Sequence, residues 1–247
     1  MSLPDPELWL WPEWRPHPRV RAVVTTRLGG NSPAPWQGFN LGANTGDHDE
    51  RVEQARKHVH QRLGSDHPPV WLEQVHGDRL IRAGEPDTRA DGVWTSDSGW
   101  PCAVLTADCL PVLLARQDGS AVAAVHAGWR GLHAGILQRA VATLHKDGVK
   151  LSAWLGPAIS APAYQVGEEL HRAFLSLGDA YEEAFQRDSQ PGHWRFSLPY
   201  AATLALNAVG VDDVSGGDYC TARDLQHFYS FRAEGQTGRF ASLVWLD

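Results

Sequence analysis

Cysteine is scarce in this 247-residue chain, which contains only Cys102, Cys109 and Cys220. An odd and sparse set argues against the disulfide framework of a small secreted protein and favours a reducing compartment. A chain of this length can bury roughly 70–75% of the surface that it exposes when unfolded, so its stability does not require disulfides. We therefore expect a globular protein with free thiols.

Long apolar runs are missing as well. No uninterrupted apolar stretch approaches the roughly 18–20 residues of a membrane span. Residues 1–7 have neither the basic segment nor the apolar core of a signal peptide. We therefore expect a cytoplasmic protein that has no membrane partner.

Positive charge is in short supply. The chain has 22 lysines and arginines against 29 acidic residues, a formal net charge of −7 and an isoelectric point near 5.9. Proteins that bind the phosphate backbone of nucleic acids need an excess of positive charge, so nucleic acid is not an expected partner. Small anionic substrates are compatible with this balance, and the composition does not indicate an oligomeric state.

The periodicity of apolar residues indicates a mixed α/β fold, in one domain that spans residues 1–247. Strands are expected at 19–26, 70–77, 103–106, 112–115, 121–126 and 151–155, with a hairpin turn at Asp118 and Gly119. Helices are expected after a cap at Asp47 or Asp49, after Gly131, after 164–168 and after a cap at Ser197. Residues 1–18 are expected to form an extended lead-in, 179–196 a peripheral helix and loop, and 220–246 two closing strands. His58 and His60 are expected mostly on the solvent face of the first helix, which Gly64 closes.

Three metal-competent side chains stand at expected strand ends: His76, Cys109 and His126. Structural zinc sites are closed and use short ligand spacings, whereas catalytic zinc commonly keeps three protein ligands and an open position. These two imidazoles and one thiol fit the second pattern. A zinc ion held there would bring the pKa of a bound water to about 7.

Other interpretations of the same three residues stay open. Blue copper also uses two histidines and a cysteine, normally with an axial methionine, but the only methionine here is Met1. Cys109 could instead act as a nucleophile with His126 as its base. The plainest interpretation is that the three side chains are ordinary hydrogen-bonded residues at strand ends.

Two arginines stand where an anion could bind. Arg27 ends an expected strand beside a Gly-Gly loop, although a surface ion pair would explain it equally well. Arg130 follows His126 at the start of an expected helix, where free backbone N–H groups favour anions.

Several motifs, taken in chain order, resemble the laccase-domain family. They are Gln74-Val75-His76-Gly77, Ala90-Asp91-Gly92, Thr106-Ala107-Asp108-Cys109 with Pro111, His126-Ala127-Gly128-Trp129-Arg130-Gly131, Gly156-Pro157, Tyr164 with Val166-Gly167 and Glu168 or Glu169, Cys220-Thr221, Phe228-Tyr229-Ser230-Phe231-Arg232 and Thr237-Gly238-Arg239. The match runs from Arg27 to the C-terminus. Phe231 departs from the family pattern, in which a second tyrosine is usual.

The resemblance implies a sandwich of mixed sheets flanked by helices, similar to the catalytic domain of deamidating bacterial toxins. The family was long labelled multicopper polyphenol oxidase and is now described as purine nucleoside phosphorylase with adenosine deaminase activity. The resemblance also implies that His76, Cys109 and His126 bind zinc. The implied reaction is phosphorolysis of adenosine, inosine and methylthioadenosine, with inorganic phosphate as co-substrate. Copper-dependent phenol oxidation, and a cysteine amidase that edits peptidoglycan precursors, are the alternatives.

The resemblance also suggests roles for residues around the metal. Asp91 and Asp108 are candidates for proton transfer during deamination, although either could simply brace a turn. Arg27, Arg130 and Arg239 are candidates for binding phosphate, and Asn40 for a hydrogen bond to the nucleoside; these four assignments rest on residue type and motif position. Cys102 is expected to be a buried residue without a chemical role.

Overall fold

The protein is described by a computed structural model, which covers residues 8–247. The prediction that residues 1–7 lack a signal peptide, and the first part of the expected lead-in, lie outside the described residues. Two sheets face each other at the centre of the molecule. One sheet has the order β1-β12-β4 and the other the order β11-β7-β5-β6-β3-β2. The predicted mixed α/β fold is therefore confirmed.

The smaller sheet is antiparallel and contains strands from both ends of the sequence. β1 (Val20–Val24) and β4 (Cys102–Thr106) pair on either side of β12 (Phe240–Leu246). Their inward side chains, including Val104 and Val244, form an apolar layer with the facing strands of the larger sheet. Cys102 lies in this layer and is fully buried.

The larger sheet is mixed, and its centre is the predicted hairpin. β5 (Leu110–Arg116) and β6 (Val122–Ala127) are antiparallel neighbours joined by the expected turn at Asp118 and Gly119. The flanking strands are β7 (Leu151–Leu155), β11 (Asp213–Gly216), β3 (Gly92–Thr95) and β2 (Leu80–Arg82). β4 and β5 follow one another in sequence but belong to different sheets, so residues 107–109 carry the chain from one sheet to the other.

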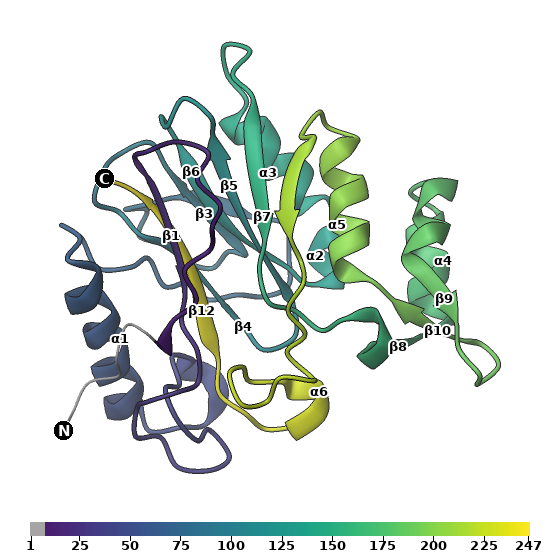
Figure 1. Cartoon of the computed structure of the whole chain (residues 1–247), viewed down its shortest axis with the longest axis horizontal. Coiled ribbons are helices and arrows are strands. Elements are labelled where there is room, and N and C mark those ends of the chain that lie inside the picture. Colours follow the sequence, from purple (N-terminus) through teal and green to yellow (C-terminus); the bar gives the residue numbers. More distant parts are fainter. Residues whose placement is uncertain (1–7) are drawn as a thin grey trace.

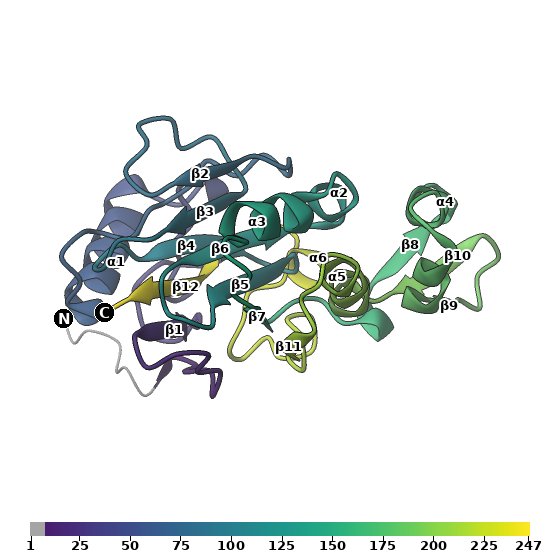
Figure 2. The ribbon, with the colours of Figure 1, turned by 90° about the horizontal axis from the view of Figure 1, so that it is seen from above.

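Helices cover the outer faces of both sheets (Figure 1, Figure 2). α1 (Asp49–Leu63) packs Val59 against the outer face of the smaller sheet. α2 (Trp129–His133), α3 (Ile136–Leu144) and α5 (Leu198–Asn207) cover the larger sheet. None of the described helices is long and apolar enough to cross a membrane.

α1 corrects two predictions. Its N-cap is His48 and not Asp47 or Asp49, because the Asp47 carboxylate is used by Ser32, Asn40 and the backbone N–H of His48. His58 was expected on the solvent face but is only 3% exposed. Its ring meets the rings of Trp9 and Phe39 edge-on. The predicted closure at Gly64 is confirmed.

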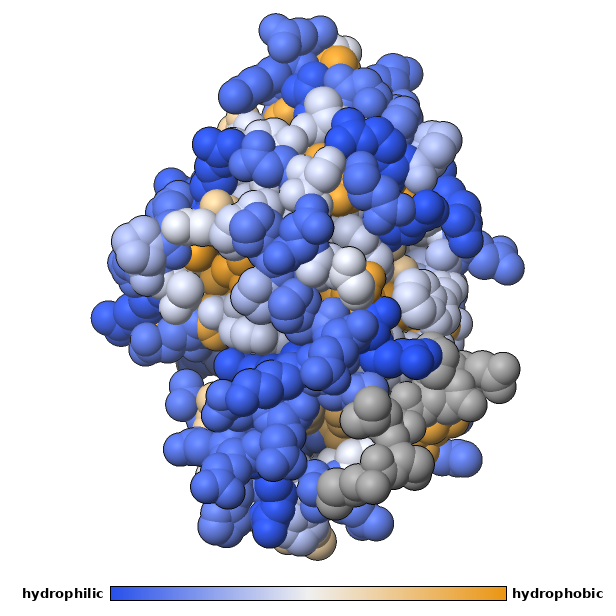
Figure 3. Space-filling model, turned by 90° about the vertical axis from the view of Figure 1, so that its left-hand side faces the viewer, coloured by the Kyte–Doolittle hydropathy of each residue, from blue (hydrophilic) through white to orange (hydrophobic). Residues whose placement is uncertain are grey.

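The rest of the helix is amphipathic as predicted, with Val52 and Val59 buried. Figure 3 shows the side of the molecule that carries α1, where hydrophilic residues cover most of the surface and hydrophobic residues show only in small groups.

Four further predictions were wrong in detail. The single helix expected after His126 is two helices, because Gly135 adopts a left-handed φ of 89° between α2 and α3. Residues 70–77 form no strand: only Val70 makes an isolated bridge. Residues 179–196 contain a 3₁₀ helix (Asp179–Ala184) but then a hairpin of β9 (Phe185–Arg187) and β10 (His193–Phe196). The C-terminal region has one strand, β12, preceded by the short helix α6 (Phe231–Glu234).

A small peripheral lobe projects from the end of the larger sheet (Figure 2). It consists of β8 (Gln165–Gly167), the hairpin of β9 and β10, and α4 (Glu168–Leu175). Phe174 and Phe196 pack at its centre. The lobe joins the body through α5, whose predicted cap is confirmed: the Ser197 side chain accepts a hydrogen bond from the backbone N–H of Tyr200.

Candidate metal centre and its cavity

His76, Cys109 and His126 come together in the structure. Their ligand atoms all lie within 4.8 Å of one another, and among residues 8–247 this is the only group of three or more such side chains that could hold a metal ion. The two imidazole rings are nearly perpendicular, with centroids 4.8 Å apart. His126 is buried and His76 is exposed, so an ion bound here would face solvent on the His76 side.

The strand register explains why Cys109 and His126 meet. In the β5–β6 ladder, Leu110 pairs with Ala127 and Pro111 with His126. Cys109 directly precedes β5 and therefore lies at the same end of the ladder as His126. Asp108 just before it adopts a φ of 95°, which is uncommon for a residue with a side chain and turns the chain sharply between the two sheets.

Asp91 ties His76 to His126. It is fully buried, and its carboxylate accepts hydrogen bonds from the backbone N–H groups of Val75, His76 and Gly77 at 2.7–3.2 Å. The same carboxylate lies 2.8 Å from Nδ1 of His126. Because Nδ1 is engaged, Nε2 of His126 is the ring nitrogen that remains for an ion, an arrangement typical of metal-bound histidine.

The electrostatics of the cluster favour a bound cation. Burial raises the pKa of the Cys109 thiol, but the two neighbouring imidazoles outweigh this and lower it to about 6, so the thiol is ionised at neutral pH. Burial lowers the pKa of His126, whereas Cys109 and Asp91 raise it to about 9. A metal ion on Nε2 takes the place of that proton, so the raised pKa reports the attraction of the site for positive charge. For Asp91, burial would raise the pKa, but hydrogen bonds from His126 and the backbone keep it low.

Gly128 leaves the space in which the ligands meet. A Cβ atom at this position would lie 3.0 Å from Sγ of Cys109 and 3.3 Å from Cδ2 of His76. We expect Gly128→Ala to weaken the binding of a metal ion to this cluster by about tenfold, since relieving such overpacking costs about 1–3 kcal/mol. Zinc titration against a competing chelator measures this. Gly167→Ala is the matched control, because its Cβ would meet nothing within 4 Å; equal zinc affinity in both variants would contradict the prediction.

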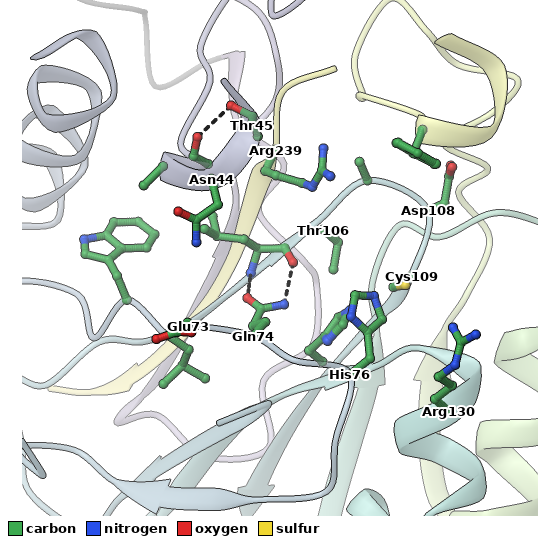
Figure 4. Close-up of a pocket in the computed structure, with 18 of the residues that line it drawn as sticks. Asn44, Thr45, Glu73, Gln74, His76, Thr106, Asp108, Cys109, Arg130 and Arg239 are labelled. Atoms are coloured by element: carbon green, nitrogen blue, oxygen red, sulfur yellow. Dashed lines mark hydrogen bonds between the residues drawn. The ribbon is translucent and has the colours of Figure 1, made fainter. Parts of the chain in front are cut away.

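The cluster opens into a cavity of about 940 Å³ (Figure 4). Four arginines line it: Arg56, Arg130, Arg232 and Arg239. Aromatic side chains line it as well, namely Trp71, Trp129, Tyr164 and Phe231. Such a combination suits a ligand that has both a planar ring and negative charge.

The residues predicted to bind phosphate or the nucleoside divide into two groups. Arg130 and Arg239 line the cavity, whereas Arg27 and Asn40 do not. The Arg27 guanidinium lies 4.5 Å from the centre of the Tyr229 ring and pairs with Glu234 at 2.8 Å, beside a second hollow. Of the two interpretations of Arg27, an anion site or an ion pair, the structure therefore favours the ion pair.

Asn40 is fully buried behind the cavity wall. Its side-chain oxygen accepts hydrogen bonds from the backbone N–H groups of Gly42 and Arg239, and its amide donates to Thr45 and Asp47. All its polar atoms are engaged within the protein, so Asn40 is placed to position Arg239 and not to touch a ligand.

The two predicted proton-transfer residues are also engaged. Asp91 does not line the cavity, and its four hydrogen bonds favour a positioning role. Asp108 lines the cavity, but Oδ1 accepts from the Thr221 hydroxyl and Oδ2 from the backbone N–H of Arg232, each at 2.6 Å. Asp108 thus fastens the turn at Thr221 and the helix α6 to the turn that presents Cys109.

Sequence reasoning missed several lining residues. Arg56 belongs to α1, where it donates to the carbonyl of Leu41 and lies 4.8 Å from the Trp71 ring. Tyr164 and Arg232 face each other at 5.1 Å. Tyr164 and Arg232 stood in quoted motifs, whereas nothing in the local pattern distinguished Arg56 and Trp71 from ordinary surface and core residues.

Two facing sheets, outer helices and a His-Cys-His cluster in an arginine-lined cavity define a mixed α/β protein with a set of ligands for one metal ion. The chain belongs to the multi-copper polyphenol oxidoreductase laccase family, whose model matches residues 21–247. The predicted resemblance is thereby confirmed.

Curated relatives and solved structures are similar to this chain over almost its whole length. The Pseudomonas aeruginosa protein named "Purine nucleoside phosphorylase PA4543" is 45% identical, over 97% of this chain and 98% of that one. "Purine nucleoside phosphorylase YfiH" of Escherichia coli is 41% identical, over 95% and 97%. The crystal structure of Neisseria meningitidis protein NMB0706 matches with a TM-score of 0.91 and 40% identity, over 97% and 99% of the two chains. YlmD of Geobacillus stearothermophilus matches with a TM-score of 0.87 and 27% identity, over 96% of each chain.

Proposed function

We propose that this protein is a zinc-dependent purine nucleoside phosphorylase that also deaminates adenosine. It would convert adenosine, inosine and methylthioadenosine with inorganic phosphate into the free base and a ribose 1-phosphate. The observation that carries the proposal is the His76–Cys109–His126 cluster on the wall of an arginine-lined cavity. The names of the relatives supply the reaction.

The donor set fits zinc. One thiolate and two imidazoles are common zinc ligands, and three protein ligands leave one position open. Asp91 fixes His126 in the orientation that ligation requires. When bound, zinc supplies Lewis acidity for polarising a substrate oxygen or an attacking water. Multicopper chemistry is a poorer fit, because the described residues contain one such cluster and the only methionine, Met1, lies outside them.

Phosphorolysis requires that phosphate and ribose be held together. A phosphate oxygen bonds to C1′ of the ribose while the bond from C1′ to the purine nitrogen breaks, and the base leaves with that electron pair and takes up a proton. Arg130 and Arg239 line the cavity on different elements and supply guanidinium donors for phosphate. Burial raises the pKa of the Tyr164 hydroxyl, so this group remains a neutral hydrogen-bond donor in the same cavity.

Deamination is the second reaction at the same site. Water replaces the amino group of adenosine and ammonia leaves, so inosine is the product. Asp108 and Asp91 both bear hydrogen bonds to the protein, and their contribution would be to hold Cys109 and His126 in place. We also propose that residues 1–247 form a single domain and that its fold is similar to that of the catalytic domain of deamidating bacterial toxins.

Product analysis tests the proposed function. Zinc-loaded protein incubated with adenosine and phosphate is expected to yield adenine, ribose 1-phosphate and inosine, separated by chromatography. Oxygen uptake on a phenol by copper-loaded protein would support the oxidase alternative instead. Release of serine from a peptidoglycan precursor would support the amidase. Absence of ribose 1-phosphate from metal-loaded protein would overturn the proposal.

An Arg130→Ala variant is expected to raise the KM for phosphate by about 10- to 100-fold. A hydrogen bond to a charged group contributes about 1.5–3 kcal/mol, and alanine removes the guanidinium. Steady-state rates at varied phosphate and saturating inosine give this value. Arg139→Ala is the matched control, since Arg139 pairs with Asp78 on the surface and does not line the cavity. An unchanged KM in Arg130→Ala would place the phosphate elsewhere.

A further inference from the structure

Thr106 is the last residue of β4 and lines the cavity beside the metal ligands. The residue is only 2% exposed. Figure 4 shows it on the wall between Arg239 and His76. It therefore borders the space in which the reacting part of a substrate would lie.

The hydroxyl of Thr106 breaks the pattern of its strand. Side chains alternate along a strand, so Thr106 shares a face with Cys102 and Val104. Both of these pack in the apolar layer between the two sheets. Valine has the same shape as threonine and would continue the layer, yet position 106 carries a hydroxyl instead.

This hydroxyl has no partner in the described part of the protein. Oγ1 of Thr106 is buried and makes no hydrogen bond there. Neighbouring polar side chains do have partners: the Gln74 amide bonds to both backbone groups of Leu105, and Thr45 donates to the carbonyl of Gly42. A buried hydroxyl without a partner is costly, and such groups gather at functional sites.

We propose that Thr106 is a substrate-binding residue whose side chain hydrogen-bonds a ribose hydroxyl of the bound nucleoside. This inference rests on the proposed function. A hydroxyl both donates and accepts, which matches the hydroxyl groups of a sugar. The position next to the ligand cluster suits the ribose, because the bond that breaks is on its C1′ atom.

The first test compares Thr106→Val with Thr106→Ser. Thr106→Val replaces the hydroxyl with a methyl group of similar size and is expected to lower kcat/KM for inosine about tenfold, the effect of about 1.4 kcal/mol. Its zinc content should equal that of the unmodified protein, and its melting temperature should be equal or higher, since an unsatisfied buried group is removed. Thr106→Ser, which keeps the hydroxyl, should recover most of the activity.

Ser242→Ala is the matched control. Ser242 is fully buried in β12, and its hydroxyl also lacks a partner in the described part of the chain, but it does not line the cavity. Removing it should leave kcat/KM unchanged. A loss of activity equal to that of Thr106→Val would mean that any buried hydroxyl in this layer matters, and would overturn the inference.

The second test uses 2′-, 3′- and 5′-deoxyinosine. The unmodified protein should discriminate against the analogue that lacks the bonded hydroxyl, and in Thr106→Val that discrimination should fall about tenfold while the other two ratios stay constant. Unchanged kcat/KM in Thr106→Val, or three unchanged ratios, would overturn the inference alone. Absence of ribose 1-phosphate with the unmodified protein would instead overturn the proposed function.

Discussion

A Cys109→Ala variant is expected to lose phosphorolysis by at least about a thousandfold and to retain almost no zinc at a concentration that saturates the unmodified protein. Metal ions contribute several kcal/mol of transition-state stabilisation, so losing the ion accounts for an effect of this size. Cys109 supplies the only thiolate of the cluster, and the adjacent imidazoles keep its pKa low. Zinc stoichiometry and inosine turnover, measured on the same preparation, check both parts.

The other two cysteines provide the controls for this experiment. Cys220 is a partly exposed thiol outside the cavity that accepts a hydrogen bond from the Ser160 hydroxyl. Cys220→Ala should keep full zinc content and activity. Cys102 is less suitable, because it is fully buried between the sheets and its truncation would leave a void. If Cys109→Ala retained activity, the Cys109 thiolate would not be required for phosphorolysis.

Asp91→Asn is expected to weaken zinc binding about 10- to 100-fold and to lower the free energy of unfolding by about 2–4 kcal/mol. Partners that orient metal ligands typically affect affinity to this extent. An asparagine presents an NH₂ group where the carboxylate accepts from the His76 loop and from His126, so at least one buried donor loses its acceptor. Chelator competition and urea denaturation measure the two effects.

Asp47→Asn separates loss of stability from loss of metal. Asp47 is also a buried carboxylate and is bonded to Ser32 and Asn40, but it lies outside the ligand cluster. We expect this variant to be destabilised and yet to bind zinc normally. If Asp47→Asn weakened zinc binding as much as Asp91→Asn, the effect of Asp91 would be one of general stability and not of ligand orientation.

The three candidate ligands could be found in the sequence because metal-competent side chains stand at the ends of apolar runs that are predicted to be strands. The hairpin of β5 and β6 could be predicted equally well, since two apolar runs flank a turn that contains Gly119. The roles of Asp91 and Asn40 could not be predicted from the sequence. Asp91 was a candidate for proton transfer and Asn40 for a hydrogen bond to the nucleoside, whereas the fold uses all their polar atoms internally.

What the sequence did not reveal depends on contacts between distant segments. His58 follows the solvent pattern of α1 but is buried by Trp9 and Phe39, which come from outside the helix. Arg56 and Trp71 meet only because α1 and the segment before His76 lie side by side. In the sequence Thr106 is only the last residue of an expected strand. That its hydroxyl is buried without a hydrogen-bond partner follows only from the three-dimensional structure.

The most direct test of the account is to titrate metal-free protein with zinc while following ribose 1-phosphate formation from inosine and phosphate. If His76, Cys109 and His126 hold the catalytic ion, activity should rise in proportion to bound zinc and level off at about one zinc per chain. Full activity in the metal-free protein, or zinc binding at this ratio without any ribose 1-phosphate, would contradict the central claim.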